Sequence, residues 1–207
     1  LKEMKNKRKK VFFEKDLEDD MEKLRRYYMN RGYLDVTVSS PTVRLSQDKT
    51  RFVIETSIEE GRPYRYGKTT FSGHLIYTSS ELAKAVEYRE NKVFSQERFE
   101  DTIRGFQELY AEKGRLRARV TPVKTFNPKT DRMDVHYNIT EGDIVYIAFV
   151  DVEGYKATKK HVFKREIVIK PGQIFQASRL RKSREKIMNL GFVDDVDVDI
   201  QGTDDPD

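Results

Sequence analysis

The chain has 207 residues and a formal net charge of +5, with 37% hydrophobic and 36% charged residues. This composition is too polar for one large hydrophobic core, while 12 Phe and 11 Tyr are too many for a disordered chain, so it favours several small domains. The absence of Cys excludes disulfides, thiolate nucleophiles and Cys-ligated zinc.

The first segment, residues 1–62, contains a basic run and an amphipathic helix. The run Lys5–Lys10 could contact lipid headgroups or nucleic acid, but such a run is more often a solvated helix end. The helix ends at Gly32, and its apolar residues recur with helical spacing: Leu17, Met21, Leu24 and Tyr28. Strands around 36–38 and over 52–58 follow. We expect a small domain whose first strand is missing.

The stretch EGRPYRYGKTT, residues 60–70, looks at first like a phosphate-binding loop, because Gly61 is followed by a Gly-Lys-Thr sequence. A P-loop has four residues between its glycines and a helix after them, whereas this stretch has five and continues with β-prone residues. We therefore interpret it as a junction between two domains. Gly61, Arg62 and Pro63 form a candidate hinge, which Pro63 stiffens because its φ is restricted.

The middle segment, residues 63–142, reads as a complete unit that starts with a strand over 69–71. A capping box, Thr78 to Glu81, predicts the start of a first helix. A second helix should begin after Ser95 and end at Gly114. Its buried stripe is predicted to be Phe99, Ile103, Phe106 and Tyr110.

After this helix the hydrophobic period changes to two, over Leu116–Val120 and again over 133–139, which predicts two strands joined by a hairpin. With two antiparallel helices between strands one and two, the first strand should run parallel to the third. The third strand then lies in the centre and the second at an edge. Pro41 and Pro122 fall within or just after second strands, which agrees because proline is tolerated at sheet edges.

The last segment, residues 143–207, follows a second candidate hinge, Gly142–Asp143. It contains a first strand, both helices and a second strand near Val196–Ile200, whereas its third strand is missing. Gln176 and Ser183 stand where the stripe of the second helix should be apolar.

The three segments repeat with a period near 80 residues. The helix-ending glycines Gly32, Gly114 and Gly191 are 82 and 77 residues apart, and the Glu-Gly pairs at Glu60 and Glu141 are 81 apart. A period this long is typical of a tandem array of small domains. The sequence predicts an α+β fold with one β-α-α-β-β domain in each segment. Each domain is a three-stranded mixed sheet covered on one face by two antiparallel helices.

This pattern resembles the POTRA (polypeptide-transport-associated) domains of BamA-type outer-membrane assembly factors. The matching stretches are the turns FSG and VEG, the terminal Glu-Gly pairs, and the helix endings YMNRGYLDV, LYAEKGRLRARV and LGFVDDVDVD. The resemblance implies a non-enzymatic periplasmic arm followed by a transmembrane β-barrel in a Gram-negative bacterium. It implies unfolded outer-membrane proteins and periplasmic lipoproteins as partners, with Lys164, Arg165 and Glu166 at the place where the family docks a lipoprotein.

An edge strand presents unpaired N–H and C=O groups, to which a client strand can add with little dependence on its sequence. The alternative is that charges along these edges only prevent aggregation. The candidate client-binding residues lie in the three second strands: Val36, Val38, Leu116, Arg117, Ala118, Arg119, Val120, Val196 and Val198.

Two other functions stay open. The chain could be the POTRA arm of a related translocation or secretion transporter, or a nucleic-acid-binding αβ array. No segment matches the RNP1 pattern, so nucleic acid is not expected as a partner. The three His have no metal-ligand spacing and no carboxylate pair lies in an apolar setting, so we expect no metal, cofactor or enzymatic reaction.

Overall fold

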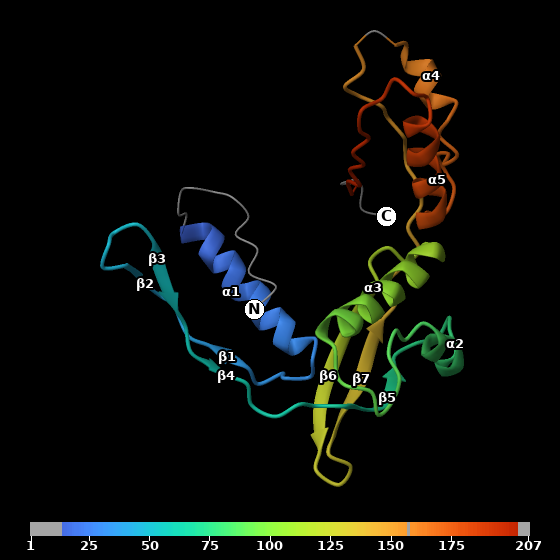
Figure 1. Ribbon diagram of the computed structural model, residues 1–207. Coiled ribbons are helices and arrows are strands. Elements are labelled where there is room, and N and C mark those ends of the chain that lie inside the picture. Colours follow the sequence, from blue (N-terminus) through green and yellow to red (C-terminus); the bar gives the residue numbers. More distant parts are fainter. Residues whose placement is uncertain (1–13, 157, 203–207) are drawn as a thin grey trace. The chain divides into compact units, whose positions relative to one another are not determined.

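A computed structural model describes residues 14–156 and 158–202 (Figure 1). These residues form two compact units. The first contains the described residues as far as Thr70 together with 83–103 and 122–137, and the second contains 71–82, 104–121 and the described residues from Asn138 onwards. Both units include parts of the middle segment, and the predicted domain boundaries stay a prediction.

The N-terminal part of the first unit is a helix followed by an interrupted hairpin. Helix α1 covers Glu14–Met29 and buries the side chain of Leu17. The hairpin strands are β1 Thr37–Val38, β2 Thr42–Leu45, β3 Phe52–Glu55 and β4 Ile58–Glu59. β1 pairs with β4 and β2 with β3, both antiparallel. The strand predicted over 52–58 is therefore broken in two, and the strand predicted around 36–38 is followed, after Pro41, by a further strand, β2. The basic run Lys5–Lys10 lies outside the described residues.

The middle segment contains a three-stranded sheet in the order β5-β7-β6 (Figure 1). The strands are β5 Tyr66–Ser72, β6 Arg119–Asn127 and β7 Arg132–Thr140. Hydrogen bonds connect β5 and β7 at a constant offset of 66 residues: Lys68 with Asp134, Thr70 with His136, and Ser72 with Asn138. A constant offset means that β5 and β7 run parallel, while β6 and β7 form a hairpin. The predicted order, with the third strand in the centre, is confirmed.

The first helix of this segment begins at the predicted capping box. Helix α2 covers Ser79–Lys84. The Thr78 N–H donates to the Glu81 carboxylate at 2.8 Å, and the Glu81 N–H donates to the Thr78 hydroxyl at 3.2 Å. The N–H groups of Thr78 and Glu81 are therefore both hydrogen-bonded by the capping box. The predicted core residue Leu82 is completely buried.

The second helix, α3, covers Gln96–Glu112 and begins directly after Ser95, as predicted. Three positions of its predicted stripe are buried: Phe99, Phe106 and Tyr110. The Phe99 ring lies 6.1 Å from the ring of Tyr137 on β7. This contact packs α3 against the central strand.

Aromatic side chains form the core of the first unit. The centroid of the Tyr66 ring lies 3.8 Å from that of the Tyr88 ring and 4.4 Å from that of the Phe94 ring. The Tyr66 hydroxyl donates to the Ser95 carbonyl at 2.6 Å. Burial raises the pKa of Tyr66, so its hydroxyl stays a protonated donor. The start of α3 is thereby tied to the start of β5.

The last segment contains two helices and, among its described residues, no strand. Helix α4 covers Lys160–Lys164 and α5 covers Ala177–Met188. The prediction of a first strand and of a second strand near Val196–Ile200 is wrong, because only an isolated bridge forms, from Tyr146 to Ile174. In the middle segment both outer strands pair with the central β7. No described residue of the last segment supplies such a central strand, so the residues predicted as its first and second strands have no neighbouring strand to hydrogen-bond with.

Ser183 of α5 occupies a position where the sequence pattern requires an apolar residue, and the structure explains why it is polar. Ser183 is buried, its hydroxyl donates to the Arg179 carbonyl at 2.8 Å, and it accepts the Val168 N–H at 3.0 Å. Thr102 of α3 makes the same two kinds of bond at the same distances. Counted from the helix start the two residues are equivalent, since each is the seventh residue of its helix. Counted from the helix end they differ, because α5 has 12 residues and α3 has 17. Counting back from the glycine therefore misplaced Ser183.

Candidate functional site

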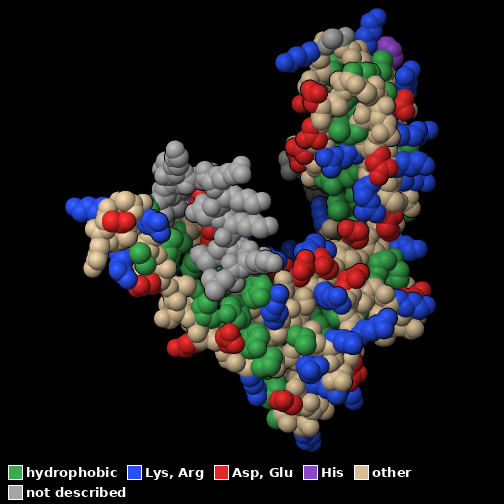
Figure 2. Space-filling model, viewed as in Figure 1, with side chains coloured by type: hydrophobic (Ala, Val, Ile, Leu, Met, Phe, Trp, Pro, Cys, Tyr) green, Lys and Arg blue, Asp and Glu red, His purple; other side chains and the backbone are tan. Residues whose placement is uncertain are grey.

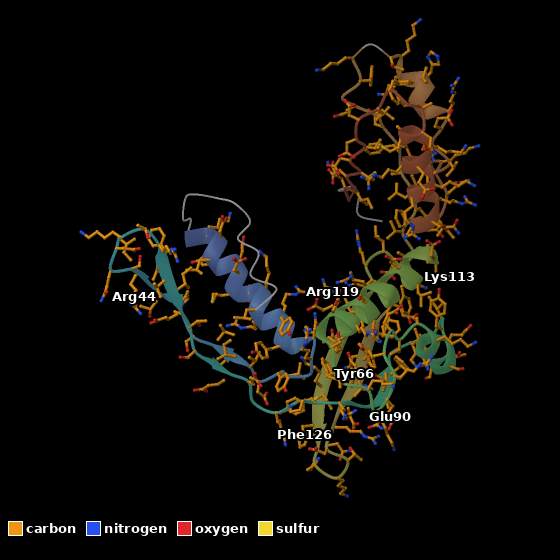
Figure 3. All side chains as sticks on the ribbon, viewed as in Figure 1. Arg44, Tyr66, Glu90, Lys113, Arg119 and Phe126 are labelled. Atoms are coloured by element: carbon orange, nitrogen blue, oxygen red, sulfur yellow. The ribbon has the colours of Figure 1, made fainter. Side chains whose placement is uncertain are left out.

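Strand β6 is the free edge of the three-stranded sheet. It has nine residues; Figure 3 labels its first residue, Arg119, and Phe126, the residue before its last. The other outer strand, β5, is partly covered, because Tyr66 exchanges backbone hydrogen bonds with Asn91 and Lys92 at 2.8 and 2.9 Å. Within the described residues, β7 alone bonds to the backbone of β6 from Arg119 to Phe126. One side of β6 is therefore available to another strand.

The side chains of β6 alternate between the sheet interior and solvent. Val120, Pro122 and Phe126 are half-buried, and the Lys124 ammonium lies 5.1 Å from the centre of the Phe99 ring. Pro122 has no N–H, so an intact ladder requires its nitrogen to face away from β7. Every second residue of an antiparallel strand turns its backbone groups to the same side. The N–H groups of Val120, Lys124 and Phe126 therefore face the free edge, with a gap at Pro122.

The predicted client-binding residues lie only partly in strands. Arg119 and Val120 begin β6, and Val38 lies in β1. The others lie outside strands: Val36, Leu116, Arg117, Ala118, Val196 and Val198. The N–H groups of Val196 and Val198 donate instead to preceding aspartates, at 2.8 and 2.9 Å. Their strand assignment was wrong, and client binding at the remaining positions stays a prediction.

The predicted docking residues Lys164, Arg165 and Glu166 lie together at the end of α4. The Lys164 ammonium is 3.9 Å from the Asp151 carboxylate. Glu166 accepts a hydrogen bond from Arg165 at 3.0 Å and lies 3.9 Å from the Lys186 ammonium. All three charges have internal partners, and their part in docking stays a prediction.

The end of α1 holds the start of the next repeat through a set of contacts that we call the N-terminal joint. Its residues are Arg26, Asn30, Gly32, Tyr64, Val93, Phe94, Glu97 and Glu100. The Gly32 carbonyl accepts the Tyr64 N–H at 2.8 Å, and the Tyr64 carbonyl accepts the Phe94 N–H at 2.9 Å. The Asn30 side-chain oxygen accepts the Glu97 N–H at 2.9 Å, so the residue directly after α1 caps α3. Arg26 and Glu100 form an ion pair at 2.9 Å.

The end of α3 holds the last segment in the same way, in the C-terminal joint. Its residues are Glu108, Glu112, Gly114, Val145, Ile174, Phe175, Ser178 and Arg181. The Gly114 carbonyl accepts the Val145 N–H at 2.8 Å, and the Val145 carbonyl accepts the Phe175 N–H at 2.9 Å. The Glu112 carboxylate accepts the Ser178 N–H at 2.5 Å and its hydroxyl at 2.7 Å. Arg181 lies 3.4 Å from Glu108 and 3.6 Å from Glu112.

Each joint depends on a glycine in the left-handed region, with φ of 94° at Gly32 and 78° at Gly114. A Cβ at Gly32 would lie 2.8 Å from the Tyr64 carbonyl oxygen, and one at Gly114 would collide with the Ile174 side chain. The sequence identified both glycines only as helix ends. It missed the joints because a side chain that caps the helix of a neighbouring repeat has the same sequence pattern as a solvated one.

The two candidate hinges, Gly61–Pro63 and Gly142–Asp143, connect successive repeats. Their glycines have positive φ angles of 71° and 68°. The Arg62 guanidinium lies 4.0 Å from the centre of the Phe126 ring, near the end of β6. These segments have ordered contacts in the structure, and bending at them stays a prediction.

Glu141 of the repeated Glu-Gly pair binds the turn that follows β5. Its carboxylate accepts the N–H of Leu75 at 2.6 Å and that of Ile76 at 2.9 Å. Burial would raise the pKa of Glu141, but hydrogen bonds to its charged form outweigh burial and hold the pKa below the ordinary 4.5. In the first repeat, burial and the Glu60 carboxylate raise the pKa of Tyr28.

Positive and negative side chains are interspersed on the face shown in Figure 2. The described ranges, 14–156 and 158–202, contain no group of three or more His, Cys, Asp or Glu able to hold a metal ion. Within these ranges no helix combines the length and the apolar character needed to cross a membrane.

The middle repeat has the order β-α-α-β-β, and both it and the last repeat are held at their start by the helix end of the repeat before them, which defines this chain as a tandem array of small α+β modules. The family model for POTRA, described as a surface antigen variable number repeat, matches residues 1–61, 64–142 and 145–207. The chain belongs to the POTRA family.

Two relatives are outer membrane protein assembly factors named BamA. The chain is 30% identical over 191 residues to the one from Nitratidesulfovibrio vulgaris and 25% identical over 193 residues to the one from Neisseria meningitidis serogroup B. The matches cover 90% and 93% of this chain, which spans 24% of the length of each relative.

The fold also matches a crystal structure of Haemophilus influenzae BamA POTRA3-5 with a TM-score of 0.83 at 20% identity, over 96% of this chain and 79% of that one. Together with the two relatives, this match confirms the resemblance to POTRA domains of BamA-type proteins. It also confirms the α+β fold class.

Proposed function

We propose that the chain is a periplasmic arm of an outer-membrane β-barrel assembly factor. It binds unfolded outer-membrane proteins by adding their strands to β6, and it docks lipoprotein subunits of the assembly complex. The free edge of β6, from Arg119 to Phe126, is the observation that carries the proposal. The BamA relatives support the assembly role.

Binding at this edge would use mainly backbone hydrogen bonds. Each contributes only about 1 kcal/mol net, so the three outward donors at Val120, Lys124 and Phe126 hold a strand weakly. Weak binding with little sequence preference suits a factor that must receive many clients and release them. The side chain of Val123, 45% exposed, adds an apolar contact for the alternating side chains of a barrel strand.

A matched pair of variants at Lys124 tests this mode of binding. Lys124→Pro removes one outward N–H, whereas Lys124→Ala keeps that N–H and removes the ammonium near the aromatic core. We expect Lys124→Pro to weaken binding of an unfolded outer-membrane strand peptide about 5-fold, and Lys124→Ala to change it less than about 2-fold. Amide chemical shifts of the labelled chain report affinity and site together.

The reverse change supplies a second test. Pro122→Thr restores a donor in the gap and should strengthen peptide binding about 5-fold. Equal effects of the two Lys124 variants, or shifts outside β6, would contradict strand addition. Binding of an oligonucleotide in place of the peptide would replace the assembly function with the nucleic-acid one.

A further inference from the structure

A cavity of about 790 Å³ opens beside the start of α3. All of its lining residues belong to the first compact unit, and none belongs to β6, so it is separate from the strand-addition edge. A volume in this range is typical of sites for small organic molecules. Its lining includes the buried residues Tyr66 and Tyr88 together with three cationic side chains.

The three cations, Arg89, Lys92 and Arg98, are brought to this cavity by two fixed segments of backbone. Arg89 and Lys92 are the first and last residues of a tight turn, because the Lys92 N–H donates to the Arg89 carbonyl at 3.2 Å. Backbone hydrogen bonds with Tyr66 hold this turn against the start of β5. The Tyr66 hydroxyl also donates to the Ser95 carbonyl, which fixes the helix start that carries Arg98.

These cations are exposed, and none of their side chains has an ion pair or hydrogen bond among the described residues. Glu90 lies between Arg89 and Lys92 in the sequence, but its carboxylate is paired with Arg132 at 2.8 Å. Glu87 supplies a carboxylate to the lining of the cavity. Three positive charges against this negative one leave an excess of two positive charges.

Arg98 occupies a position that is unfavourable for a cation. It is the third residue of α3, where the positive end of the helix dipole repels a positive charge. The N–H groups at this helix start are already bound, that of Glu97 by Asn30 and that of Arg98 by the Ser95 hydroxyl at 3.4 Å. A ligand would therefore be held by the side chains of the cations, and an anion would offset their repulsion.

We propose that Arg89, Lys92 and Arg98, which we call the cation cluster, bind the phosphate group of a phosphate ester. Each guanidinium can donate two parallel hydrogen bonds to phosphate oxygens, and the ammonium adds a point charge. A phosphate monoester carries about two negative charges at pH 7, which matches the excess of two positive charges, whereas a single carboxylate does not. The remaining cavity, lined by Tyr66 and Tyr88, holds the organic part of the ester.

Two probes test this site and distinguish a soluble ester from a membrane headgroup. Glycerol 3-phosphate is titrated into the labelled 207-residue chain, with potassium chloride of equal ionic strength as the control. Cosedimentation is measured with vesicles of phosphatidylglycerol, and with phosphatidylcholine vesicles as their control. Amide shifts at residues 87–98 with a dissociation constant of about 1 mM would support a soluble ester. Cosedimentation that Arg98→Gln reduces, without such shifts, would support a lipid headgroup.

Matched variants show whether the cation cluster holds the phosphate. Lys92→Gln and Lys113→Gln remove the same charge from exposed side chains, and Lys113 directly follows the other end of α3 (Figure 3). We expect Lys92→Gln to weaken binding about 3-fold and Lys113→Gln to change it less than about 1.3-fold. Arg98→Gln should weaken binding about 5-fold and Arg98→Lys about 2-fold, since lysine keeps the charge and loses the planar fork. Urea unfolding checks that each variant stays folded.

Three results would overturn the proposal. The first is the absence of shifts at 87–98 together with vesicle binding that is absent or that Arg98→Gln leaves unchanged. The second is equal weakening by Lys92→Gln and Lys113→Gln, which would mean attraction by net charge alone. The third is tighter binding of a Glu-Glu dipeptide with blocked termini than of glycerol 3-phosphate, which would assign the cluster to an acidic peptide.

Discussion

The N-terminal and C-terminal joints share a backbone and differ in charge. In both, a glycine carbonyl accepts a backbone N–H at the start of the next repeat, at 2.8 Å. The ion pair is reversed: the helix end carries Arg26 and the next repeat Glu100, whereas in the other joint the helix end carries Glu108 and the next repeat Arg181. The shared backbone hydrogen bond could therefore hold any repeat, and the charged side chains determine which repeat fits each helix end.

This selection is repulsive as well as attractive. If the last repeat docked on α1, Arg26 would face Arg181, and if the middle repeat docked on α3, Glu108 would face Glu100. Like charges at a contact discriminate against wrong partners even when the correct ion pair is exposed and contributes little. The charges of the two joints therefore favour docking of each repeat on the helix end that precedes it in the chain.

The caps differ as well. Asn30 is neutral and accepts the Glu97 N–H, whereas Glu112 is a carboxylate that accepts both the N–H and the hydroxyl of Ser178. A negative charge is favoured at the positive end of a helix dipole. The C-terminal cap should therefore contribute more free energy than the N-terminal one.

The largest expected effect comes from filling the glycine of a joint. Gly32→Ala adds a Cβ at positive φ and places it against the Tyr64 carbonyl, so we expect a loss of about 3 kcal/mol in the free energy of unfolding. Gly191→Ala is the matched control: it has the same backbone strain and open space, and should cost about 1 kcal/mol. Urea unfolding of both variants, followed by amide signals, measures the difference. Equal losses would mean that Gly32 serves only as a helix end.

A second effect depends on pH and concerns the Glu-Gly pair before the C-terminal joint. Because the pKa of Glu141 is lower in the folded protein, the unfolded state binds more protons as pH falls below about 4.5. Its contribution is present in full above pH 4.5 and is lost as pH falls through the lowered value. Glu141→Gln should cost about 2 kcal/mol at pH 7 and flatten this acid dependence.

The control for that prediction is Glu60→Gln, which alters the corresponding residue of the first repeat. Glu60 lies beside Tyr28 and not beside a pair of turn N–H groups, so this variant should leave the acid limb of the stability curve in place. Stability curves measured by urea unfolding from pH 3 to pH 7 compare the two. A steep acid limb that survives in Glu141→Gln would disprove the assignment.

The caps are expected to have a smaller effect. Glu112→Ala should cost about 1.5 kcal/mol and Asn30→Ala about 0.7 kcal/mol, because loss of a cap costs about 0.5–2 kcal/mol and only Glu112 is charged. Thermal unfolding at low ionic strength gives both values. Added salt should reduce the loss in Glu112→Ala and leave that in Asn30→Ala unchanged. The opposite order of losses would remove the distinction between the joints.

The ion pairs should have the smallest effect on stability and the clearest sign. Arg26→Glu and Glu100→Arg should each cost about 0.5 kcal/mol, and the double variant should recover most of the loss. A double-mutant cycle in urea measures the coupling. A double variant as unstable as the sum of the singles would show that Arg26 and Glu100 do not act on each other.

The sequence predicted well whatever is decided within one repeat. The capping box at Thr78, the helix after Ser95 and the edge position of β6 all follow from local pattern and connectivity. Each of these features depends on residues close in sequence or on the direction in which two helices must return the chain. The POTRA resemblance was visible for the same reason, since the pattern recurs three times.

The sequence failed where a partner outside the local pattern decides the structure. Val196 and Val198 alternate like a strand, but a strand forms only beside another strand, and the described residues of the last segment supply none. Ser183 looked misplaced because one missing turn of α5 shifted the register by which it was read. Asn30 and Glu112 looked like ordinary surface residues, because their hydrogen-bond partners belong to the following repeat.

Hydrogen exchange at the Glu97 and Ser178 amides tests most directly that each helix end holds the next repeat. Both N–H groups lie in the first turn of a helix, where no intrahelical acceptor exists, so protection there reports the cap from the preceding repeat. We expect both amides to be protected, with Asn30→Ala exposing only Glu97 and Glu112→Ala exposing only Ser178. Fast exchange of both amides in the unmodified chain would contradict the joints.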